Sequence, residues 1–178
     1  GDCPLISFDL VDEVIATYLE SKVEYVSNIN PPTYPDGLDV EVFSINALKY
    51  AAKNATKLFD REHVTPFIKK YFKNQSINVS NKFDLSKLRW TVDEASDLKV
   101  IKNIFNYFKP NILFTWKDIY SLYDKKTELF LENSFIERNE GALMSNGQKM
   151  WKKAKTLIPG GTMLLSKRPE LFLPERWP

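Results

Sequence analysis

Two aspartates of this chain have the surroundings expected of ligands for a metal ion or another phosphate-bound cation. Asp93 ends residues 88–93, which predict a short β-strand, and a helical pattern follows directly. Ligands of open α/β sheets bind outside the carboxyl ends of strands, so a carboxylate there is well placed to hold a cation. Asp2, in the sequence GDCPL at residues 1–5, is a second such carboxylate. Together they suggest chemistry on a metal–nucleotide complex.

The spacing of the two aspartates leaves two interpretations open. Magnesium prefers octahedral oxygen coordination and usually takes only one or two protein carboxylates, which Asp2 and Asp93 could supply from separate loops. Each aspartate could instead only cap the helix that follows it, because carboxylates are favoured near helix N-termini. Spacing alone favours the capping interpretation, since acids before helices are common.

Asp39 and Glu41 form a second candidate pair. Residues 38–43 alternate polar and apolar side chains, which predicts a half-buried strand with both carboxylates on one face. They could hydrogen-bond a sugar, or they could form the solvent-facing side of an edge strand. Gly37 precedes them, and the close backbone approach that glycine permits slightly favours the binding interpretation.

The only histidine, His63, lies beside Arg61 and Glu62. A histidine in an acid–base cluster can act as a general base near neutral pH. A lone histidine before a helix is more often structural, and we prefer that interpretation. The sequence therefore predicts no catalytic residue in this cluster.

The elements that must position these side chains alternate between strands and helices. Helices are expected at residues 7–19, 45–58, 62–73, 98–108, 115–124, 127–135 and 148–157. Ser7 and Ser44 are the expected N-caps of the first two, and the apolar stripe of the first helix extends from Leu10 to Leu19. Strands are expected at residues 24–28, 38–43, 77–79 and 88–93. This alternation predicts an α/β fold with a mostly parallel sheet. The sequence lacks a glycine-rich phosphate-binding loop between a strand and a helix.

Composition excludes several classes of protein. The net charge is +2 with acids and bases interleaved, so there is no signature of binding to a nucleic-acid polymer. The single Cys3 excludes an internal disulfide and a cysteine-based zinc site. No apolar run approaches the roughly 20 residues of a membrane span, and the N-terminus does not resemble a signal peptide. We therefore expect a cytoplasmic protein without a membrane partner.

Four motifs follow one another in order: GDCPLI at 1–6, YPDGLDVEVF at 34–43, REHVTP at 61–66 and WTVDEASDL at 90–98. This series resembles the spore-coat-polysaccharide branch of the sugar cytidylyltransferases, relatives of the CMP-sugar synthetases. Residues 114–119, 128–129 and 138–141 also resemble the C-terminal segment of that branch. One departure is Ala95-Ser96, where the family usually has Pro-Glu, although both pairs suit the first turn of a helix.

The resemblance implies a partial Rossmann-like nucleotidyltransferase sheet with flanking helices and a helical C-terminal extension. It implies that Asp2 and Asp93 bind the Mg²⁺ that accompanies CTP. The expected partners are a nucleotide and a sugar, and the expected reaction attaches CMP to the sugar for surface polysaccharide biosynthesis, with pyrophosphate leaving. Such a transfer needs positioning and charge neutralisation more than covalent help, so no catalytic residue is assigned. The expected substrate-binding residues are Asp39, Glu41, Arg61, Glu62 and His63.

The end of the chain resembles a different family. WKKAKTLIPGG at 151–161 and PELFLP at 169–174 look like the opening of a class III aminotransferase of the glutamate-1-semialdehyde type. In those enzymes the lysine that binds pyridoxal phosphate lies far downstream, and no residue of this chain corresponds to it. Pyridoxal phosphate is therefore expected only in a downstream domain outside this chain.

These resemblances predict three parts: residues 1–138 as the C-terminal part of a cytidylyltransferase domain, 139–147 as a linker, and 148–178 as a truncated start of an aminotransferase domain. The family's loop for the base and triphosphate would precede Gly1, so we expect this chain alone neither to bind CTP tightly nor to turn over. Two alternatives stay open: an accessory region of a pyridoxal-phosphate-dependent aminotransferase, and a non-catalytic sugar- or nucleotide-binding module. A homodimer is also left open.

Overall fold

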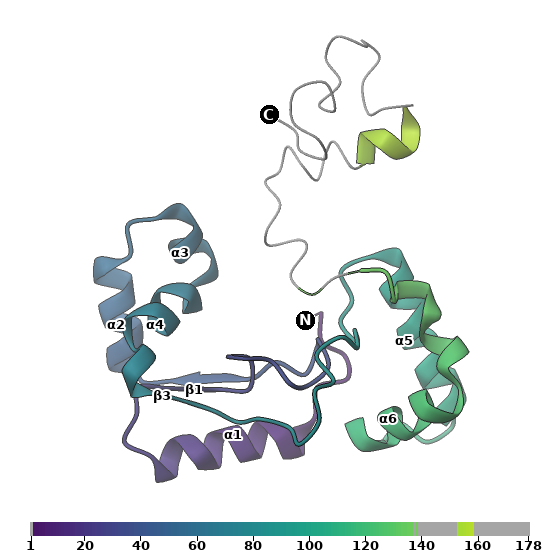
Figure 1. The fold of residues 1–178 in the computed structure, drawn as a ribbon, viewed down its shortest axis with the longest axis horizontal. Helices are drawn as coiled ribbons and strands as arrows, with labels where there is room; N and C mark the ends of the chain where they lie inside the picture. The colour runs from purple at the N-terminus through teal and green to yellow at the C-terminus, as the bar shows by residue number, and fades with distance from the viewer. Residues whose placement is uncertain (1, 137, 139–152, 159–178) are drawn as a thin grey trace. The chain divides into compact units, whose positions relative to one another are not determined.

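The computed structural model describes residues 2–136, 138 and 153–158 (Figure 1). The chain divides into two compact units, Gly1–Ile136 and Glu137–Pro178. All of the strands and longer helices described below belong to the first unit.

A small mixed sheet forms the middle of the first unit. Strand β1 (Tyr25–Ser27) is buried and lies between β2 (Glu41–Phe43) and β3 (Ser76–Asn78). β1 pairs with β3 in parallel and with β2 in antiparallel orientation. The α/β fold is therefore confirmed, but the expectation of a mostly parallel sheet is wrong. The reason is that the connection between β1 and β2 contains no helix, and parallel pairing needs a longer crossover.

Strand β2 is shorter than the predicted strand at residues 38–43 because Asn28 takes the place of a strand partner. The Asn28 side chain is fully buried. Its Nδ2 donates to the Leu38 carbonyl at 2.7 Å, and its Oδ1 accepts the Val40 N–H at 2.8 Å. The Asn28 side chain thus takes the hydrogen bonds of the Leu38 carbonyl and the Val40 N–H, which a neighbouring strand would otherwise take.

Most helices follow the predicted pattern, but the helix predicted at 45–58 ends at Asn54, and two short helices that begin at Leu58 replace the single helix predicted at 62–73. The helices are α1 (Phe8–Glu20), α2 (Ile45–Asn54), α3 (Leu58–His63), α4 (Thr65–Tyr71), α5 (Ala95–Phe108) and α6 (Trp116–Lys125), with 3-10 helices η1 (Lys73–Gln75) and η2 (Thr127–Asn133). The expected N-caps Ser7 and Ser44 are confirmed, and Ser44 Oγ accepts the Ala47 N–H at 2.9 Å. The predicted helix at 127–135 is a 3-10 helix rather than an α-helix.

Helix α1 lies along the sheet, where it contacts β1 and β2 (Figure 1). Its Leu10 and Val14 are buried, whereas Leu19, predicted on the same apolar stripe, is 75% exposed. The main core extends from this helix to α5 and α6 and includes Trp90, which is 1% exposed. A smaller core joins β1 to α2 and α4 through Tyr25, Ala47, Ala51 and Ile68.

Residues 88–93 do not form the predicted strand. Their one β-bridge joins Arg89 to Asp36. In it the Asp36 N–H donates to the Leu88 carbonyl at 2.8 Å, and the Trp90 N–H donates to the Asp36 carbonyl at 2.7 Å. Further along, the Val92 N–H donates to the Asp2 carbonyl at 2.7 Å. Because the partners belong to two irregular segments, no continuous ladder forms. Asp93 nevertheless lies just before α5, separated from it only by the N-cap Glu94.

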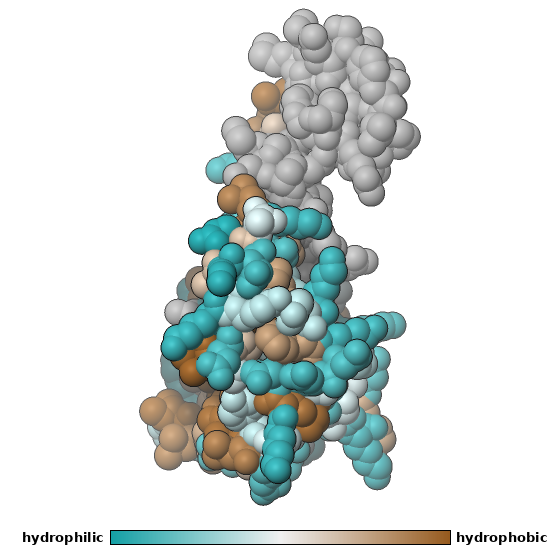
Figure 2. Space-filling view, turned by 90° about the vertical axis from the view of Figure 1, so that its left-hand side faces the viewer, coloured by the Kyte–Doolittle hydropathy of each residue, from teal (hydrophilic) through white to brown (hydrophobic). Residues whose placement is uncertain are grey.

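Helices α2, α3 and α4 form one end of the unit, on the side that Figure 2 shows. That face is largely hydrophilic, with separate hydrophobic patches (Figure 2). These helices expose several apolar side chains, including Leu58, Phe59 and Tyr71. Between α3 and α4, Val64 has a positive φ of 60°, an uncommon backbone conformation for a β-branched residue.

In the second unit, residues 153–157 are helical, inside the helix predicted at 148–157. The predicted linker 139–147 lies outside the described residues, as do residues 151–152 and 159–178 of the aminotransferase-like motifs. The division into a linker and an aminotransferase start therefore stays a prediction. Within the part of the chain that the structure describes, no helix has the length and apolar character needed to cross a membrane.

Candidate metal and nucleotide site

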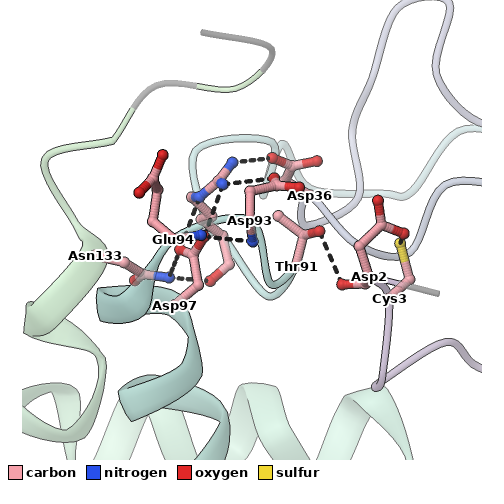
Figure 3. A network of polar contacts seen from close by, with 9 residues as sticks. Asp2, Cys3, Asp36, Thr91, Asp93, Glu94, Asp97 and Asn133 are labelled. Carbon is pink, nitrogen blue, oxygen red and sulfur yellow. Dashed lines mark hydrogen bonds and ion pairs between the residues drawn. The ribbon is translucent and has the colours of Figure 1, made fainter. Parts of the chain in front are cut away.

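Asp2 and Asp93 come from distant parts of the sequence and are brought to the same place by the backbone. The Asp2 carbonyl accepts the Val92 N–H at 2.7 Å and the Thr91 hydroxyl at 3.0 Å. Asp93 is the next residue, so the two aspartates lie on adjoining segments (Figure 3). Asp2 is exposed, and the Asp93 side chain is 53% exposed. Both carboxylates are therefore accessible to a ligand.

Neither aspartate caps a helix. The N-cap of α1 is Ser7, and the N-cap of α5 is Glu94, which forms a capping box with Asp97. The interpretation of Asp2 and Asp93 as mere caps, which spacing alone favoured, is therefore wrong. Their metal-binding role stays a prediction.

Arg89 organises this site, and the sequence reasoning did not single it out. Its Nε and Nη2 donate to the two oxygens of Asp97, both at 2.9 Å. Its Nη1 donates to Asp36 Oδ2 at 2.9 Å, and Nη2 also donates to Asp93 Oδ2 at 2.8 Å. The Arg89 side chain is only 7% exposed. One buried guanidinium thus contacts three carboxylates.

Asp97 is the fully buried partner of that guanidinium. Its carboxylate also accepts the N–H groups of Asp93 at 3.0 Å and Glu94 at 2.9 Å, and Asn133 Nδ2 at 2.9 Å (Figure 3). Burial alone raises the pKa of Asp97, but the Arg89 guanidinium and these N–H donors lower it to about 2. Burial likewise lowers the pKa of Arg89, and its carboxylate partners raise it above the usual value. Both groups are therefore charged at neutral pH.

The arrangement fits magnesium only if substrate or water completes the coordination. Among the described residues, no three His, Cys, Asp or Glu side chains are placed together as ligands for a metal ion. Asp36 and Asp97 direct their carboxylates to Arg89, which leaves Asp2 and Asp93 as the accessible pair. Magnesium commonly takes one or two carboxylates and fills the other positions with water and phosphate oxygens, so Asp2 and Asp93 are the residues that could hold it here.

Cys3 lies beside the candidate site but is poorly suited to be a nucleophile. Its Sγ–H donates to Asp2 Oδ1 at 3.5 Å. Burial and the neighbouring Asp2 carboxylate raise the pKa of the Cys3 thiol to about 11. The thiol is therefore protonated at neutral pH, and only the thiolate is a good nucleophile.

The predicted sugar-binding pair is divided between two environments. Glu41 Oε1 accepts the Tyr25 hydroxyl at 2.9 Å and forms an ion pair with Lys69 of α4. Asp39 is half-buried and precedes β2. Both roles in substrate binding stay predictions.

Gly37 does not provide the open approach for a ligand that the sequence suggested. Its φ is +99°, and a Cβ on this residue would lie 2.7 Å from the Trp90 carbonyl carbon. The Trp90–Thr91 backbone therefore occupies the space that glycine leaves, and the interpretation based on ligand approach is wrong.

Arg61, Glu62 and His63 lie on α3, at the opposite end of the unit from α5 (Figure 1). Arg61 Nη1 donates to the carbonyls of Ala52 at 3.2 Å and Ala55 at 3.3 Å, which satisfies the end of α2. The His63 ring lies 4.6 Å from the Phe59 ring, and all three residues of the cluster are exposed. The structure thus separates this cluster from Asp2 and Asp93. Its role in sugar binding stays a prediction.

A small cavity of about 130 Å³ lies between α2 and α3 and is lined mainly by apolar side chains. Leu48, Ala51 and Ala55 of this lining are accompanied by Asp60 and Arg61. A volume of this size is far below that of a usual nucleotide or sugar-nucleotide pocket.

Known proteins resemble this chain in sequence and in structure. An uncharacterised protein of Methanocaldococcus jannaschii is 34% identical over 141 residues, which cover 78% of this chain and 56% of that protein. A cytidylyltransferase structure from Leptospira borgpetersenii serovar Hardjo-bovis matches with a TM-score of 0.71 and 26% identity, over 78% of this chain and 58% of that one. The chain thus spans somewhat more than half the length of these two relatives.

The first half of the sequence identifies the family of this chain. Residues 1–89 of the 178 match the cytidylyltransferase family model, including Asp2, Asp36 and Arg89. The structural match extends over most of the chain and supports the same nucleotidyltransferase fold. The chain belongs to the cytidylyltransferase family.

Proposed function

We propose that the protein carrying this chain transfers CMP from CTP to a sugar and serves surface polysaccharide biosynthesis. The observation that carries the proposal is the pairing of Asp2 with Thr91 and Val92, which sets two accessible carboxylates on adjoining segments. In the proposed reaction, a sugar hydroxyl oxygen bonds to the α-phosphorus of CTP. The bond to pyrophosphate breaks, and the hydroxyl proton is released.

In this proposal Asp2 and Asp93 hold Mg²⁺, which neutralises charge on the triphosphate when bound. Protein groups then contribute mainly by orientation, because phosphoryl transfer gains most from positioning and electrostatic stabilisation. The activity also requires a cytoplasmic location, where CTP is available.

We place the sugar near Asp39 and Glu41, whose carboxylates can accept hydroxyl hydrogen bonds. The contacts of Glu41 with Tyr25 and Lys69 support a fixed orientation of that carboxylate. Glu62 and His63 are exposed on α3 and remain available for contact with a substrate. Arg61 would have to keep or exchange its hydrogen bonds to the end of α2.

The test is pyrophosphate release by the full-length protein that contains this chain, with CTP, Mg²⁺ and a panel of sugars. Asp93→Asn keeps the side-chain shape but removes the charge, and we expect it to lower turnover at least about 100-fold, the scale of losing one strong electrostatic contact to a transition state. Lys99→Gln is the matched control, since Lys99 lies on α5 in an exposed ion pair with Glu132. Full turnover by Asp93→Asn would contradict the metal assignment.

We further propose that the parent protein continues into a class III aminotransferase domain, on the strength of the motifs at residues 151–161 and 169–174. This part of the proposal is independent of the metal site. The full-length reading frame and the absorption of bound pyridoxal phosphate test it. A downstream sequence without a lysine for that cofactor contradicts it.

A further inference from the structure

We propose that Arg89 is a positioning residue that fixes the orientation of the Asp93 carboxylate, on the segment adjoining Asp2, through its buried ion pair with Asp97. The inference rests on the proposed function in one respect, namely that Asp93 is a metal ligand. It adds a residue that does not itself touch the metal but determines where one of the ligands lies.

The contacts of Asp93 carry the first step. Its side-chain Oδ2 accepts from Arg89 Nη2 at 2.8 Å, and its backbone N–H donates to Asp97 Oδ2 at 3.0 Å. Arg89 and Asp97 are in turn joined by two parallel hydrogen bonds of 2.9 Å. A bidentate arginine–carboxylate pair has a fixed planar geometry. Both ends of Asp93 are therefore held by one rigid pair.

The pair is itself anchored from two other parts of the fold. Asp36, whose backbone bridges Arg89, accepts Arg89 Nη1 at 2.9 Å. From η2, Asn133 Nδ2 donates to the Arg89 carbonyl at 3.0 Å and to Asp97 Oδ1 at 2.9 Å. Asn133 is 3% exposed. These contacts leave the guanidinium little freedom to rotate.

The charges of its neighbours explain why a positively charged side chain, Arg89, is needed at this position. The three carboxylates of Asp36, Asp93 and Asp97 all contact this one guanidinium. Without Arg89, Asp97 and Asp36 would repel the carboxylate of Asp93. With Arg89, Asp93 is held in place while half of its side chain stays accessible.

Arg89→Lys separates geometry from charge. Lysine keeps the positive charge but is a single ammonium on a flexible stem, so it cannot form the planar fork to Asp97 and reach Asp93 and Asp36 together. Positioning predicts that this variant weakens metal binding at Asp93. If Arg89 only neutralises the neighbouring carboxylates, the lysine variant should bind the metal at Asp93 as well as the wild type does.

The experiment is ¹⁵N NMR of the full-length protein that contains this chain, saturated with CTP and titrated with Mn²⁺, whose paramagnetism broadens nearby amide signals. In the wild type we expect the Cys3 and Glu94 amides, next to Asp2 and Asp93, to broaden selectively. In Arg89→Lys we expect the broadening at Glu94 to need about 10-fold more Mn²⁺ or greater, the scale on which residues that orient metal ligands act. Lys99→Gln should behave as the wild type, and Asp93→Asn should lose the Glu94 effect.

The outcomes separate this inference from the proposed function. Equal broadening at Glu94 in wild type and in folded Arg89→Lys overturns the positioning role and leaves the metal site intact. No selective broadening at Cys3 or Glu94 in the wild type overturns the metal assignment and the inference with it.

If Arg89→Lys does not fold, a measurement on the wild type alone still tests the positioning role of Arg89. In a titration with diamagnetic Mg²⁺, the Arg89 Nε–H signal is expected to shift with the same midpoint as the Glu94 amide, because Asp93 and Asp97 join the two groups. An unchanged Nε–H signal while Glu94 shifts overturns the inference.

Discussion

The two candidate regions of this protein are built in different ways. Around Asp93, a buried arginine contacts its carboxylate and is paired with a buried aspartate, Asp97. A buried asparagine, Asn133, reaches Asp97 from 36 residues further along the chain. Around Arg61, the candidate residues are consecutive, exposed and on one short helix. The Arg89 cluster is determined by tertiary structure, whereas the Arg61 cluster is determined by local sequence.

This difference matters for energetics as well as for function. Removing one partner of a buried ion pair leaves an uncompensated charge in the interior, which is strongly destabilising. Exposed hydrogen bonds and ion pairs contribute little, because water replaces them. Substitutions in the two regions should therefore differ several-fold in their effect on stability.

The largest effect is expected for Asp97→Ala. It removes the bidentate partner of Arg89 and the acceptor for the N–H groups of Asp93 and Glu94. We expect the free energy of unfolding to fall by about 3–5 kcal/mol, measured by urea denaturation. Glu132→Gln, which removes the exposed partner of Lys99, should change it by less than about 1 kcal/mol. Equal losses in the two variants would remove the contrast between buried and exposed pairs.

Gly37→Ala should have the next largest effect, because it acts on the backbone contact beneath the Arg89 cluster. The added Cβ would lie 2.7 Å from the Trp90 carbonyl carbon, and φ is +99°. We expect a loss of about 1–3 kcal/mol in the same measurement. Gly37→Asn tests the cause, since asparagine tolerates positive φ better than alanine but carries the same Cβ. Recovery of stability in Gly37→Asn would mean that backbone strain, rather than the close contact, dominates.

A smaller effect is expected from alkaline pH in the region of Glu41. Burial raises the pKa of Tyr25, with the carboxylates of Glu41 and Asp39 acting in the same direction. Above pH 10 the unfolded chain loses this proton while the folded chain keeps it, so the free energy of unfolding should fall by up to about 1.4 kcal/mol per pH unit. Below pH 10 Tyr25 contributes no slope. Unfolding of wild type and Tyr25→Phe from pH 8 to 11 checks this, and identical slopes would contradict it.

The sequence predicted the local features of this fold well. Apolar periodicity placed α1, α5 and α6, and the serine signals placed the starts of α1 and α2. These features depend on neighbours within one or two turns. The assignment of residues 88–93 as a strand failed because their partners are Asp2 and Asp36, and nothing local distinguishes such single contacts from a ladder.

The Arg89 cluster shows where sequence reasoning stops. A charged residue within a segment expected to be buried is a signal, because a buried arginine requires partners. That signal could have singled out Arg89, but not its contacts: Asp36 lies 53 residues away, and Asn133 lies 44 residues away. Asp97 could be read as a first-turn acid of α5, and only the structure shows that its carboxylate faces inward.

The smallest effect on stability is expected for Arg61→Gln, and it tests the contrast most directly. Arg61 donates to the carbonyls of Ala52 and Ala55 from an exposed position, so we expect a loss of about 0.5 kcal/mol in urea unfolding. If Arg61 also binds the sugar, the variant should raise the KM for sugar in the full-length protein while the KM for CTP stays constant. Arg61→Lys, which keeps the charge, should then restore part of the affinity. Loss of a charged hydrogen bond to the sugar should cost more free energy than loss of these exposed contacts to α2, so it should be visible in the KM. An unchanged KM for the sugar would therefore mean that Arg61 only caps α2.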